Sequence, residues 1–472
     1  MYDLAIIGAG PAGMAAAEAA CEHGMRAVII DQQEQAGGQI LRRPPASFSV
    51  RAWLQQRVYR QLHQLYARFI KLDKLTHLHG TTVLGIGVEE HHFVLHINGP
   101  SGLEPLLASR VLVASGCFDM PLVFPGAQLP GVMATGGMQA FLKSQQIIPG
   151  KRFLFVGSHP LQLIVANQIA KAGGDVAGVF FSPSLSKYLA VLRSPLVLLR
   201  QLPNMLFFVG VLAQLLLRRV PVKFGTELVS ANGDNALEDV VLKQDSSSTN
   251  MKPIACDRLG LCFGFLTNND LVRQVGVVCS WSQNAGGWIA DHDQGMRASV
   301  SGIYVAGETT GVAGASVACL EGRLAALSAA CDSGKMEQPA YDTACGAVHA
   351  PLKGARAFAQ LLAEASYPGD ATIQRAMSDD AYLCKCEEVT VGSVRATLAQ
   401  HPDVSDLNAL KLLTRCGMGH CQGRYCHYQS RFLLATDRNL PVESMAGFTA
   451  RFPIRPTSIG ELIGDLRAED ME

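Results

Sequence analysis

Charged side chains are scarce in this chain of 472 residues: they make up 17% of it, against 48% hydrophobic residues. The 40 basic and 40 acidic side chains cancel, so the formal net charge is zero. Nucleic-acid binding needs a basic surplus to neutralise phosphates, and this balance therefore argues against it. The length predicts about two to four domains. The low charge is explained either by buried parallel strands or by apolar surface that a partner subunit covers.

A long uninterrupted apolar segment is also missing. Within the apolar stretch 194–219, the charge-free run from Gln201 to Leu217 contains Pro203 and is shorter than the ~20 residues that span a bilayer. We expect a helical hairpin that packs on a neighbouring domain or subunit, with peripheral membrane contact through the flanking arginines as the alternative. The strand-like opening MYDLAIIGAG predicts no secretory leader. With 13 cysteines, a cytoplasmic location is expected.

What the chain does contain, at its first residues, is a dinucleotide-binding pattern. Residues 3–8 predict a buried strand that leads into the turn GAGPAG, with glycines at G-x-G-x-x-G spacing. The first glycine permits the tight turn, the second lets a pyrophosphate approach, and the third lets the helix pack on the strand. The helix offers its N-terminus to phosphate, and the acid ending the second strand would bind a ribose hydroxyl. The predicted contacts are Gly8, Gly10, Pro11, Ala12, Gly13 and Asp31.

Three further segments complete this site. They are the loop EQAGGQ, the strand segment RVLVASGCFDMPLVFPG and the later block SGIYVAGETTGVAG. They contribute Gly38, Gln39, Ala114, Gly307 and Glu308. The arrangement resembles the two-dinucleotide-binding-domain flavoproteins, in which an acid in the late block contacts the ribityl chain of the flavin. The resemblance implies FAD, with NAD or ATP in the same groove as alternatives. Glu308 departs from the aspartate that is usual there.

Two electron routes that are common in such flavoproteins are absent from the sequence. Residues 151–181 predict a second strand–turn–helix–strand unit, but its turn reads Gly157-Ser-His-Pro. His159 stands where a glycine would admit a pyrophosphate, and Pro160 lacks an N–H donor. We predict a degenerate copy, although His159 could contact a phosphate. The segment that corresponds to the redox cysteine pair of disulfide reductases reads ATGGMQAF and contains no cysteine.

Cysteines gather instead near the carboxyl end, in CKCEEVTVG…TRCGMGHCQGRYC. They are Cys384, Cys386, Cys416, Cys421 and Cys426. Thiolates at C-x-C and C-x4-C spacing suit an iron–sulfur cluster or a zinc ion. The intervening glycines free the backbone to wrap a cluster and to present N–H groups to sulfide. Spacing alone leaves zinc open, whereas the flavin-type domain upstream favours iron and sulfide.

This segment resembles the bacterioferritin-associated-ferredoxin-like [2Fe–2S] module. Matching its pattern C-x-C-E-x-V-T and T-R-x-G-M-G-x-C-Q-G-x-x-C implies four metal ligands, Cys384, Cys386, Cys421 and Cys426. Cys416 falls on a variable position of the pattern and is interpreted as a cysteine that does not bind the metal. The alternative is that Cys416 replaces one of the four ligands. His420 and His427 are interpreted as surface histidines.

Nearly the whole chain resembles the large subunits of the opine oxidase, D-hydroxyproline dehydrogenase and hydrogen cyanide synthase family, most specifically in residues 286–322. The resemblance implies an electron-transfer subunit that works beside a glycine-oxidase-like flavoprotein, which oxidises a secondary amine or amino acid. It also implies FMN at the subunit interface, an external electron acceptor and a small ferredoxin-like subunit. The acidic turn Asp291-His292-Asp293 is interpreted as solvated, and no catalytic residue is assigned. A stand-alone NAD(P)H-dependent reductase and a zinc-binding scaffold are the alternatives.

The expected fold is α/β, a two-dinucleotide-binding-domain flavoprotein fold followed by a small, mainly helical [2Fe–2S] domain. Five parts are predicted: a split FAD-type domain (1–120 and 286–335), an inserted degenerate NAD(P)-like domain (121–285), a helical linker (336–375), the [2Fe–2S] domain (376–436) and a tail (437–472). We expect the Pro-rich tail to lie on a partner or on the flavin domain.

Overall fold

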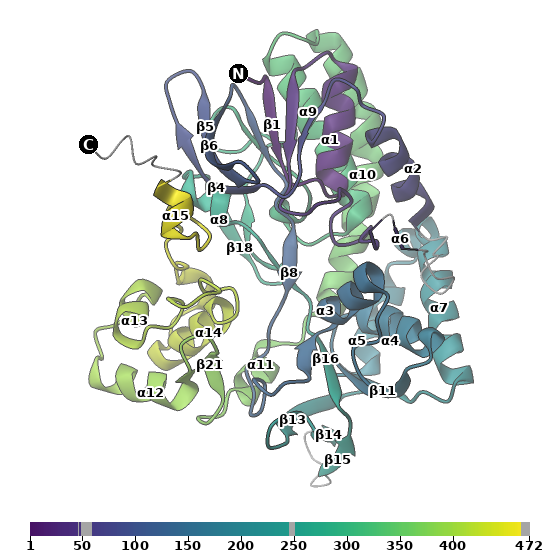
Figure 1. The fold of residues 1–472 in the computed structure, drawn as a ribbon. Coiled ribbons are helices and arrows are strands. Elements are labelled where there is room, and N and C mark those ends of the chain that lie inside the picture. The colour runs from purple at the N-terminus through teal and green to yellow at the C-terminus, as the bar shows by residue number, and fades with distance from the viewer. Residues whose placement is uncertain (46, 49–58, 245–250, 464–472) are drawn as a thin grey trace.

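The computed structural model describes residues 1–45, 47–48, 59–244 and 251–463. Two parallel sheets, each covered by helices, form the bulk of the molecule, and a small helical unit that carries the cysteine cluster lies beside them (Figure 1). This is the α/β architecture with a carboxyl-terminal module that the sequence predicts.

The first sheet consists of five parallel strands in the order β20-β7-β1-β2-β3. The strands are β1 (Leu4–Ile7), β2 (Ala27–Ile30), β3 (Thr76–Leu78), β7 (Val111–Val113) and β20 (Ile303–Val305). Parallel strands covered on both faces read as continuous apolar runs, and every residue of β1 and β2 is buried. Because β20 comes from much later in the sequence than β7, two separated segments of the chain build this sheet.

Alternate residues of β1 face two different cores. Leu4 and Ile6 face the helices, which are α1 (Pro11–Glu22), α2 (Arg60–Phe69), α9 (Ala315–Asp332) and the long α10 (Gln338–Ser366). Ala5 and Ile7 face an antiparallel sheet of β4 (Thr82–Val88), β5 (Phe93–Gly99) and β6 (Gly102–Ala108). This alternation follows from the two-residue period of a strand. Because both faces of the sheet are covered in this way, the carboxyl ends of its strands form the edge that is left open.

The second sheet also has five parallel strands, in the order β12-β11-β10-β16-β9. The strands are β9 (Val132–Ala134), β10 (Arg152–Gly157), β11 (Asp175–Phe181), β12 (Val222–Phe224) and β16 (Arg258–Cys262). Its helical elements are α3 (Thr135–Ala140), the π-helix η3 (Phe141–Gln145), α4 (Leu161–Ala172) and α7 (Leu202–Leu217). An antiparallel sheet of β13 (Thr226–Asn232), β14 (Asp239–Gln244) and β15 (Met251–Ala255) extends from it.

Short elements connect the two sheets. β8 (Cys117–Asp119) pairs with β17 (Phe265–Thr267), α8 (Asp270–Gln274) follows, β18 (Cys279–Ser282) pairs with β19 (Gly287–Ala290), and the 3-10 helix η5 (Gly307–Thr310) follows β20.

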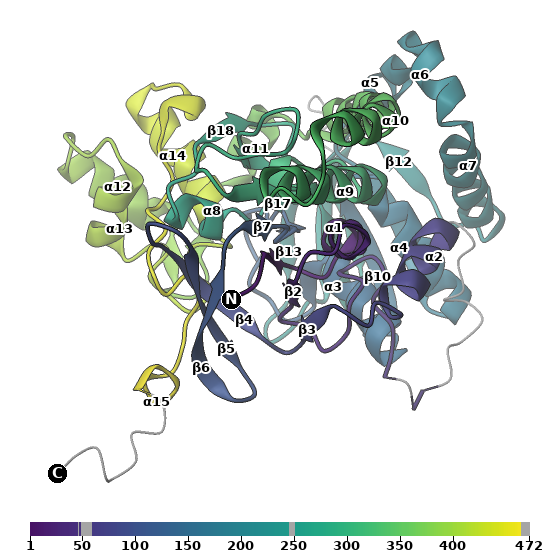
Figure 2. The ribbon, with the colours of Figure 1, turned by 90° about the horizontal axis from the view of Figure 1, so that it is seen from above.

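The apolar stretch between β11 and β12 forms α5 (Leu185–Leu189), the 3-10 helix η4 (Ala190–Arg193), α6 (Pro195–Arg200) and then α7. None of the helices in the described residues has the length and apolar character needed to cross a bilayer. In both ribbon views these helices lie on the opposite side of the molecule from the cysteine module (Figures 1 and 2).

The cysteine module begins after α11 (Asp370–Ala376). It comprises β21 (Tyr382–Cys384), β22 (Val389–Thr390), α12 (Val391–Gln400), α13 (Leu407–Thr414) and α14 (His427–Arg438), and the tail adds the 3-10 helix η6 (Val442–Ser444) and α15 (Ile459–Ile463). Its apolar residues share one continuous core with the second sheet, in which Leu383 and Phe432 belong to the same cluster as Leu122 and Leu261. The module is therefore packed against the second sheet and is not joined to it by a linker alone.

Candidate functional site

A cavity of about 690 Å³ is lined by residues of the first sheet and by helices and loops of the second sheet's domain. Ten of the eleven predicted nucleotide contacts line it, all except Gly13. They come together because the loops that follow parallel strands meet at the same edge of a sheet. The volume is in the range of small-molecule sites, ~300–1,000 Å³.

The glycine turn has the close approaches that the motif predicts. Gly8 has φ +103°, and a Cβ there would lie 2.4 Å from the carbonyl oxygen of Ala114. At Gly10, by contrast, the nearest atom to such a Cβ is the Cα of Gly38 at 3.9 Å, so this position borders open space. α1 starts at Pro11, and no side chain caps its first turn. Its N–H groups are therefore available to an anion, and the residues present fit a dinucleotide pyrophosphate.

Asp31 is tied to the glycine turn. Its Oδ2 accepts a hydrogen bond from the N–H of Ala9 at 2.6 Å, and its Oδ1 accepts one from the N–H of Gln33 at 2.7 Å. The carboxylate thus fixes the turn to the end of β2 at the wall of the cavity. Each oxygen keeps a second lone pair, so binding of a ribose hydroxyl by Asp31 stays a prediction that this geometry permits.

Glu308 lines the same cavity, but its carboxylate binds its own loop. Its oxygens accept hydrogen bonds from the N–H groups of Ala313 at 2.9 Å and Gly314 at 3.0 Å. Burial raises the pKa of Glu308 to about 7, although these two donors oppose the shift. Contact between Glu308 and a ribityl chain remains a prediction. The observed role of Glu308 is to hold the loop that leads into α9.

Lys143 and Asp119 are ionisable residues of the cavity that are not among the predicted contacts. Lys143, on η3, reaches across from the second sheet's domain and donates to the carbonyl oxygen of Ile40 at 2.9 Å. Asp119, on β8, accepts from the N–H of Gly136 at 3.2 Å. Burial lowers the pKa of Lys143 to about 8 and raises the pKa of Asp119 to about 6. Asp119 lies within the strand segment RVLVASGCFDMPLVFPG, so its position in the cavity could have been predicted from the sequence. No local sequence pattern predicts that Lys143 lies near the first glycine turn.

The second strand–turn–helix unit satisfies its own turn donors. The N–H groups of Ser158 and His159 both donate to the carbonyl oxygen of Cys262, at 2.8 and 2.9 Å. Nδ1 of His159 accepts from the N–H of Leu161 at 3.2 Å and so caps α4. Burial lowers the pKa of His159 to about 4, which keeps the ring neutral near pH 7. The donors that would hold a pyrophosphate in this turn are therefore already used inside the protein.

The cysteine module gathers thiols in a buried site. The Sγ atoms of Cys384, Cys416 and Cys426 all lie within 4.8 Å of one another. Cys386 is hydrogen-bonded to Cys421 and interacts electrostatically with Cys384. Hydrogen bonds from Cys416 and Cys426 lower the pKa of Cys384 to about 2, and a thiolate is the form that binds metal. Distance does not separate Cys416 from the predicted ligands, so the ligand set stays a prediction.

The loops that carry these thiols approach one another closely. A Cβ on Gly419 would lie 2.4 Å from the Cβ of Cys386, so only glycine allows the two cysteine loops to meet. An ion pair at 2.7 Å between Arg415 and Glu387 links the same loops. Arg415 and Gln422 have φ of 64° and 51°, a left-handed conformation that non-glycine residues rarely adopt. Such backbone is retained where the surroundings enforce it, frequently at functional sites.

His427 is only partly exposed and packs against the tail, which differs from the free surface position expected for it. Its ring stacks on Phe448 with centroids 4.7 Å apart, and its Nε2 accepts from the N–H of Phe448 at 3.1 Å. Burial lowers the pKa of His427 to about 3. His420 is exposed, as expected. The tail that brings Phe448 to the module continues onto the flavin-type domain, where the N–H of Ile454 donates to Leu84 at 2.9 Å.

The thiol site adjoins the wall of the cavity. Arg424, which lies between Cys421 and Cys426 in the sequence, places its guanidinium 5.8 Å from the ring centroid of Phe118, a cavity residue. Next to it, the hydroxyl of Tyr425 donates to the carbonyl oxygen of Leu122 at 3.2 Å. The C-x4-C loop is thus packed against the strand segment that leaves the cavity.

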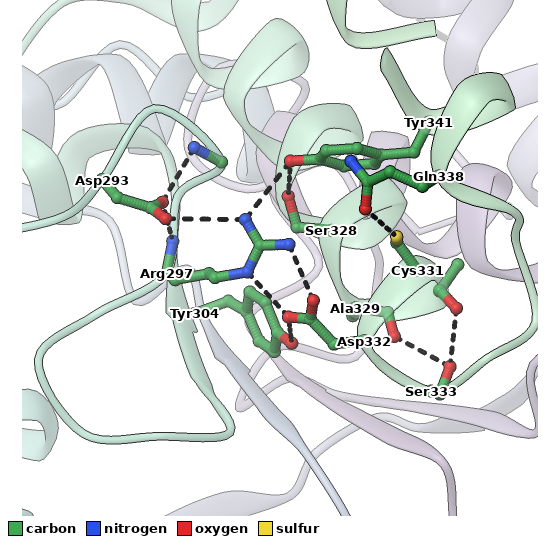
Figure 3. Close-up of polar contacts among 12 residues, drawn as sticks. Asp293, Arg297, Tyr304, Ser328, Ala329, Cys331, Asp332, Ser333, Gln338 and Tyr341 are labelled. Atoms are coloured by element: carbon green, nitrogen blue, oxygen red, sulfur yellow. Dashed lines mark hydrogen bonds and ion pairs between the residues drawn. The ribbon is translucent and has the colours of Figure 1, made fainter.

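The acidic turn at Asp293 has a structural role. Asp293 accepts hydrogen bonds from the N–H groups of Gly295 and Arg297. Figure 3 shows the guanidinium of Arg297 bound to Asp332, with both N–O distances at 2.7 Å. The hydroxyl of Tyr304 also donates to Asp332, at 2.6 Å. This network fixes the turn to α9.

Comparisons with known proteins agree with this architecture. Residues 2–334 match the pyridine nucleotide-disulphide oxidoreductase family, and residues 382–436 match the BFD-like [2Fe-2S] binding domain. Hydrogen cyanide synthase subunit HcnB of Pseudomonas aeruginosa is 31% identical over 96% of each chain. An opine oxidase subunit of Agrobacterium tumefaciens is 30% identical over 98% of this chain and 91% of that protein.

Solved structures show the same fold at lower identity. L-Proline dehydrogenase from P. horikoshii aligns with a TM-score of 0.71 at 18% identity, over 98% of this chain and 79% of that one. Thioredoxin reductase from T. acidophilum aligns with a TM-score of 0.52 at 19% identity, over 70% of this chain and 98% of that one. The chain therefore belongs to the pyridine nucleotide-disulphide oxidoreductase family, carries a BFD-like [2Fe–2S] domain, and is homologous over its full length to HcnB and to the opine oxidase subunit of Agrobacterium tumefaciens.

Proposed function

We propose that this chain is the flavin and iron–sulfur electron-transfer subunit of a heteromeric dehydrogenase that oxidises a secondary amine or an amino acid, such as D-hydroxyproline or an opine. The observation that carries the proposal is the contact between the nucleotide cavity and the thiol site through Phe118 and Arg424. It is supported by relatives whose names describe them as subunits of an oxidase and of a synthase.

In this proposal, amine oxidation takes place on a glycine-oxidase-like flavoprotein partner. The cavity carboxyl groups of Asp119 and Glu308 both accept hydrogen bonds from the chain's own backbone, which suits positioning of loops better than proton abstraction from a substrate. A small ferredoxin-like subunit, FMN at the subunit interface and an external electron acceptor belong to the same proposal. Electrons from the partner would leave through the cysteine module.

For cofactors, we propose FAD in the cavity, with NAD or ATP as alternatives, and a [2Fe–2S] cluster on the thiols. The glycine turn, the Gly38–Gln39 loop and Asp31 would hold the nucleotide, and the uncapped start of α1 would bind its phosphates. When bound, a flavin exchanges two electrons and an iron–sulfur cluster exchanges one. Lys143 adds a buried cation beside the phosphate-binding loop.

The predicted division of the chain is part of this proposal. The split flavin-type domain (1–120 and 286–335) and the NAD(P)-like domain (121–285) would form the two walls of the cavity, and the [2Fe–2S] domain (376–436) would provide the exit for electrons. We propose a cytoplasmic protein whose contact with membranes is peripheral.

Co-expression with a glycine-oxidase-like flavoprotein as the candidate partner tests the function. The purified complex should oxidise members of a panel of secondary amines and amino acids with an artificial acceptor, while this chain alone should not. Cys421→Ser is expected to keep the complex intact and to abolish reduction of acceptors that the cluster serves. Amine oxidation by the isolated chain would refute its assignment as an electron-transfer subunit. Bleaching of its flavin absorbance by NADH would support a stand-alone reductase instead.

A further inference from the structure

The outward side of α7 carries apolar side chains, although the solvent-facing side of a surface helix is normally polar. Leu202, Leu206 and Leu216 are exposed at spacings that place them along one face, and Leu217 beside them is 84% exposed. The opposite side, which includes Leu215, is buried in the core of the second sheet's domain. α7 is therefore apolar on both sides, and one of these sides is covered by no described residue of the chain.

The preceding helix α6 continues this surface. Leu196 is 76% exposed and Leu199 is 67% exposed. We name the six exposed leucines of the two helices the leucine face: Leu196, Leu199, Leu202, Leu206, Leu216 and Leu217. Exposed apolar residues that occur singly need no explanation, but a group of this kind on neighbouring helices marks an interaction surface.

The charged residues within the chain segment that carries the leucine face all have one sign. Between Asp175 and Glu227 the chain has no acidic residue but has six basic ones, whereas the whole chain has 40 of each. Three of these basic residues border the helices: Arg200 ends α6, and Arg218 and Arg219 follow α7. All three are exposed. A partner of this surface should therefore offer an apolar region that contacts the leucines and negative charges that contact the arginines.

We propose that α6 and α7 dock this protein onto the surface of an anionic phospholipid bilayer. The leucine face would lie among the acyl chains just below the headgroups, and the arginines would contact lipid phosphates. Both helices would lie in the plane of the interface, since neither is long enough to cross it.

Two observations favour lipid over a protein partner. Binding hot spots between proteins are enriched in Trp, Tyr and Arg with Leu under-represented, whereas the large hydrophobic side chains exposed on α6 and α7 are the six leucines and Val209, with no aromatic residue among them. A long segment that has basic but no acidic residues is complementary in charge to a uniformly anionic surface. A lipid surface of this kind can bind it without a complementary shape. The proposal goes beyond the electron-transfer function and does not depend on it. Docking here would leave the cysteine module free, because it lies on the opposite side of the molecule (Figure 2).

Co-sedimentation of the full-length, cofactor-containing protein with vesicles tests the proposal. Binding to vesicles that contain phosphatidylglycerol is expected, with much weaker binding to pure phosphatidylcholine and a decline as salt is added. The double variant Leu206→Ser/Leu217→Ser should abolish binding. Arg218→Gln/Arg219→Gln should weaken binding by roughly fivefold per charge removed. Both pairs are exposed, and unchanged flavin content and melting temperature would verify that the variants fold.

Leu412→Ser serves as the matched control, since Leu412 is 74% exposed on the distant helix α13; it should leave vesicle binding unchanged. Absence of vesicle binding, or equal binding to both lipids, would overturn the proposal. It would equally be overturned if the leucine variants left vesicle binding intact but broke a complex with the partner subunit or a second copy of the chain. Size-exclusion chromatography with light scattering would detect that outcome.

Discussion

At the scale of single residues, the five thiols of the cysteine module differ in their surroundings. Cys384, Cys416 and Cys426 are buried, Cys421 is partly exposed, and Cys386 is exposed. Cys416 also has a partner of its own, because the hydroxyl of Ser430 lies 3.9 Å from its sulfur. A thiol can therefore belong to this group either as a metal ligand or as a buried neighbour of ligands.

Serine substitutions distinguish the two roles. Cys384→Ser, Cys421→Ser and Cys426→Ser should each lose iron and sulfide, because a four-thiolate site loses a ligand that serine replaces poorly. Cys416→Ser should keep both, since it leaves the four predicted ligands in place. Iron and sulfide assays with visible absorbance spectra provide the measurement. Loss of iron in Cys416→Ser together with its retention in Cys421→Ser would assign Cys416 as the ligand in place of Cys421. Stoichiometric zinc in the unsubstituted protein would contradict the iron–sulfur assignment and indicate a zinc site.

Glu308 predicts a pH dependence of stability. Burial raises its pKa from the ordinary 4.5 to about 7, so between these values the folded chain binds more protons than the unfolded one. Its contribution is fully present below about pH 4.5 and is lost as the pH rises through about 7. Glu308→Gln should therefore flatten the decline in the free energy of unfolding over this window, by roughly 3 kcal/mol.

Denaturant unfolding across this pH range measures the effect. The exposed Glu104→Gln is the matched control and should reproduce the wild-type profile. An unaltered profile in Glu308→Gln would mean that this carboxyl group ionises normally in the folded protein.

At the scale of elements, the turn before α4 shows how a nucleotide-type unit can serve as scaffold. His159 caps the helix through Leu161, and the carbonyl oxygen of Cys262 takes the two N–H groups that a pyrophosphate would need. The ring of His159 also packs on Phe265, with centroids 5.1 Å apart. The strand–turn–helix shape is kept, while its donors are satisfied internally.

His159→Ala should lower stability without creating a nucleotide site. Loss of the cap costs about 1 kcal/mol, measurable as a lower free energy of unfolding, and NADH should still fail to bleach the flavin because Cys262 still occupies the donors. His420→Ala, at an exposed position, is the control and should change neither quantity. Reduction of His159→Ala by NADH would identify the imidazole as the sole obstacle in this turn.

At the scale of the whole molecule, the cysteine module and the second sheet share one core. Leu122 and Leu261 on one side belong to the same buried cluster as Leu383 and Phe432 on the other. The module itself packs on the second sheet, and the tail crosses the module and continues to the flavin-type domain, where Ile454 donates to Leu84 of β4. Removal of the module would therefore expose apolar surface on the rest of the protein.

A chain that ends at residue 375 tests this coupling. We expect a lower melting temperature, aggregation and binding of a hydrophobic dye, because the shared core would be opened to water. Cys421→Ser is the control, since it removes a predicted metal ligand but leaves the core in place; it should melt above the truncated chain. If the truncated chain melted like the intact protein, the module would be an independent domain.

Local patterns were enough to predict much of the first site. Gly8 and Gly10 are recognisable because a tight turn between a strand and a helix restricts which residues fit, and that restriction acts over a few neighbours. The other predicted contacts follow strands of the same sheet, so the rule that these ends meet brings them to one cavity. Lys143 could not be predicted, because the second sheet's domain must fold and dock before its side chain reaches Ile40.

The sequence by itself determined the α/β fold, the dinucleotide motif and the presence of a thiol site, since each depends on spacing within a short segment. Only the tertiary structure decided which thiols are neighbours, that the ring of His427 stacks under the tail, and that α7 leaves an apolar side uncovered. These features depend on contacts between segments far apart in the chain. Burial, close approach and exposure arise from packing, and packing is settled only when the whole chain is folded.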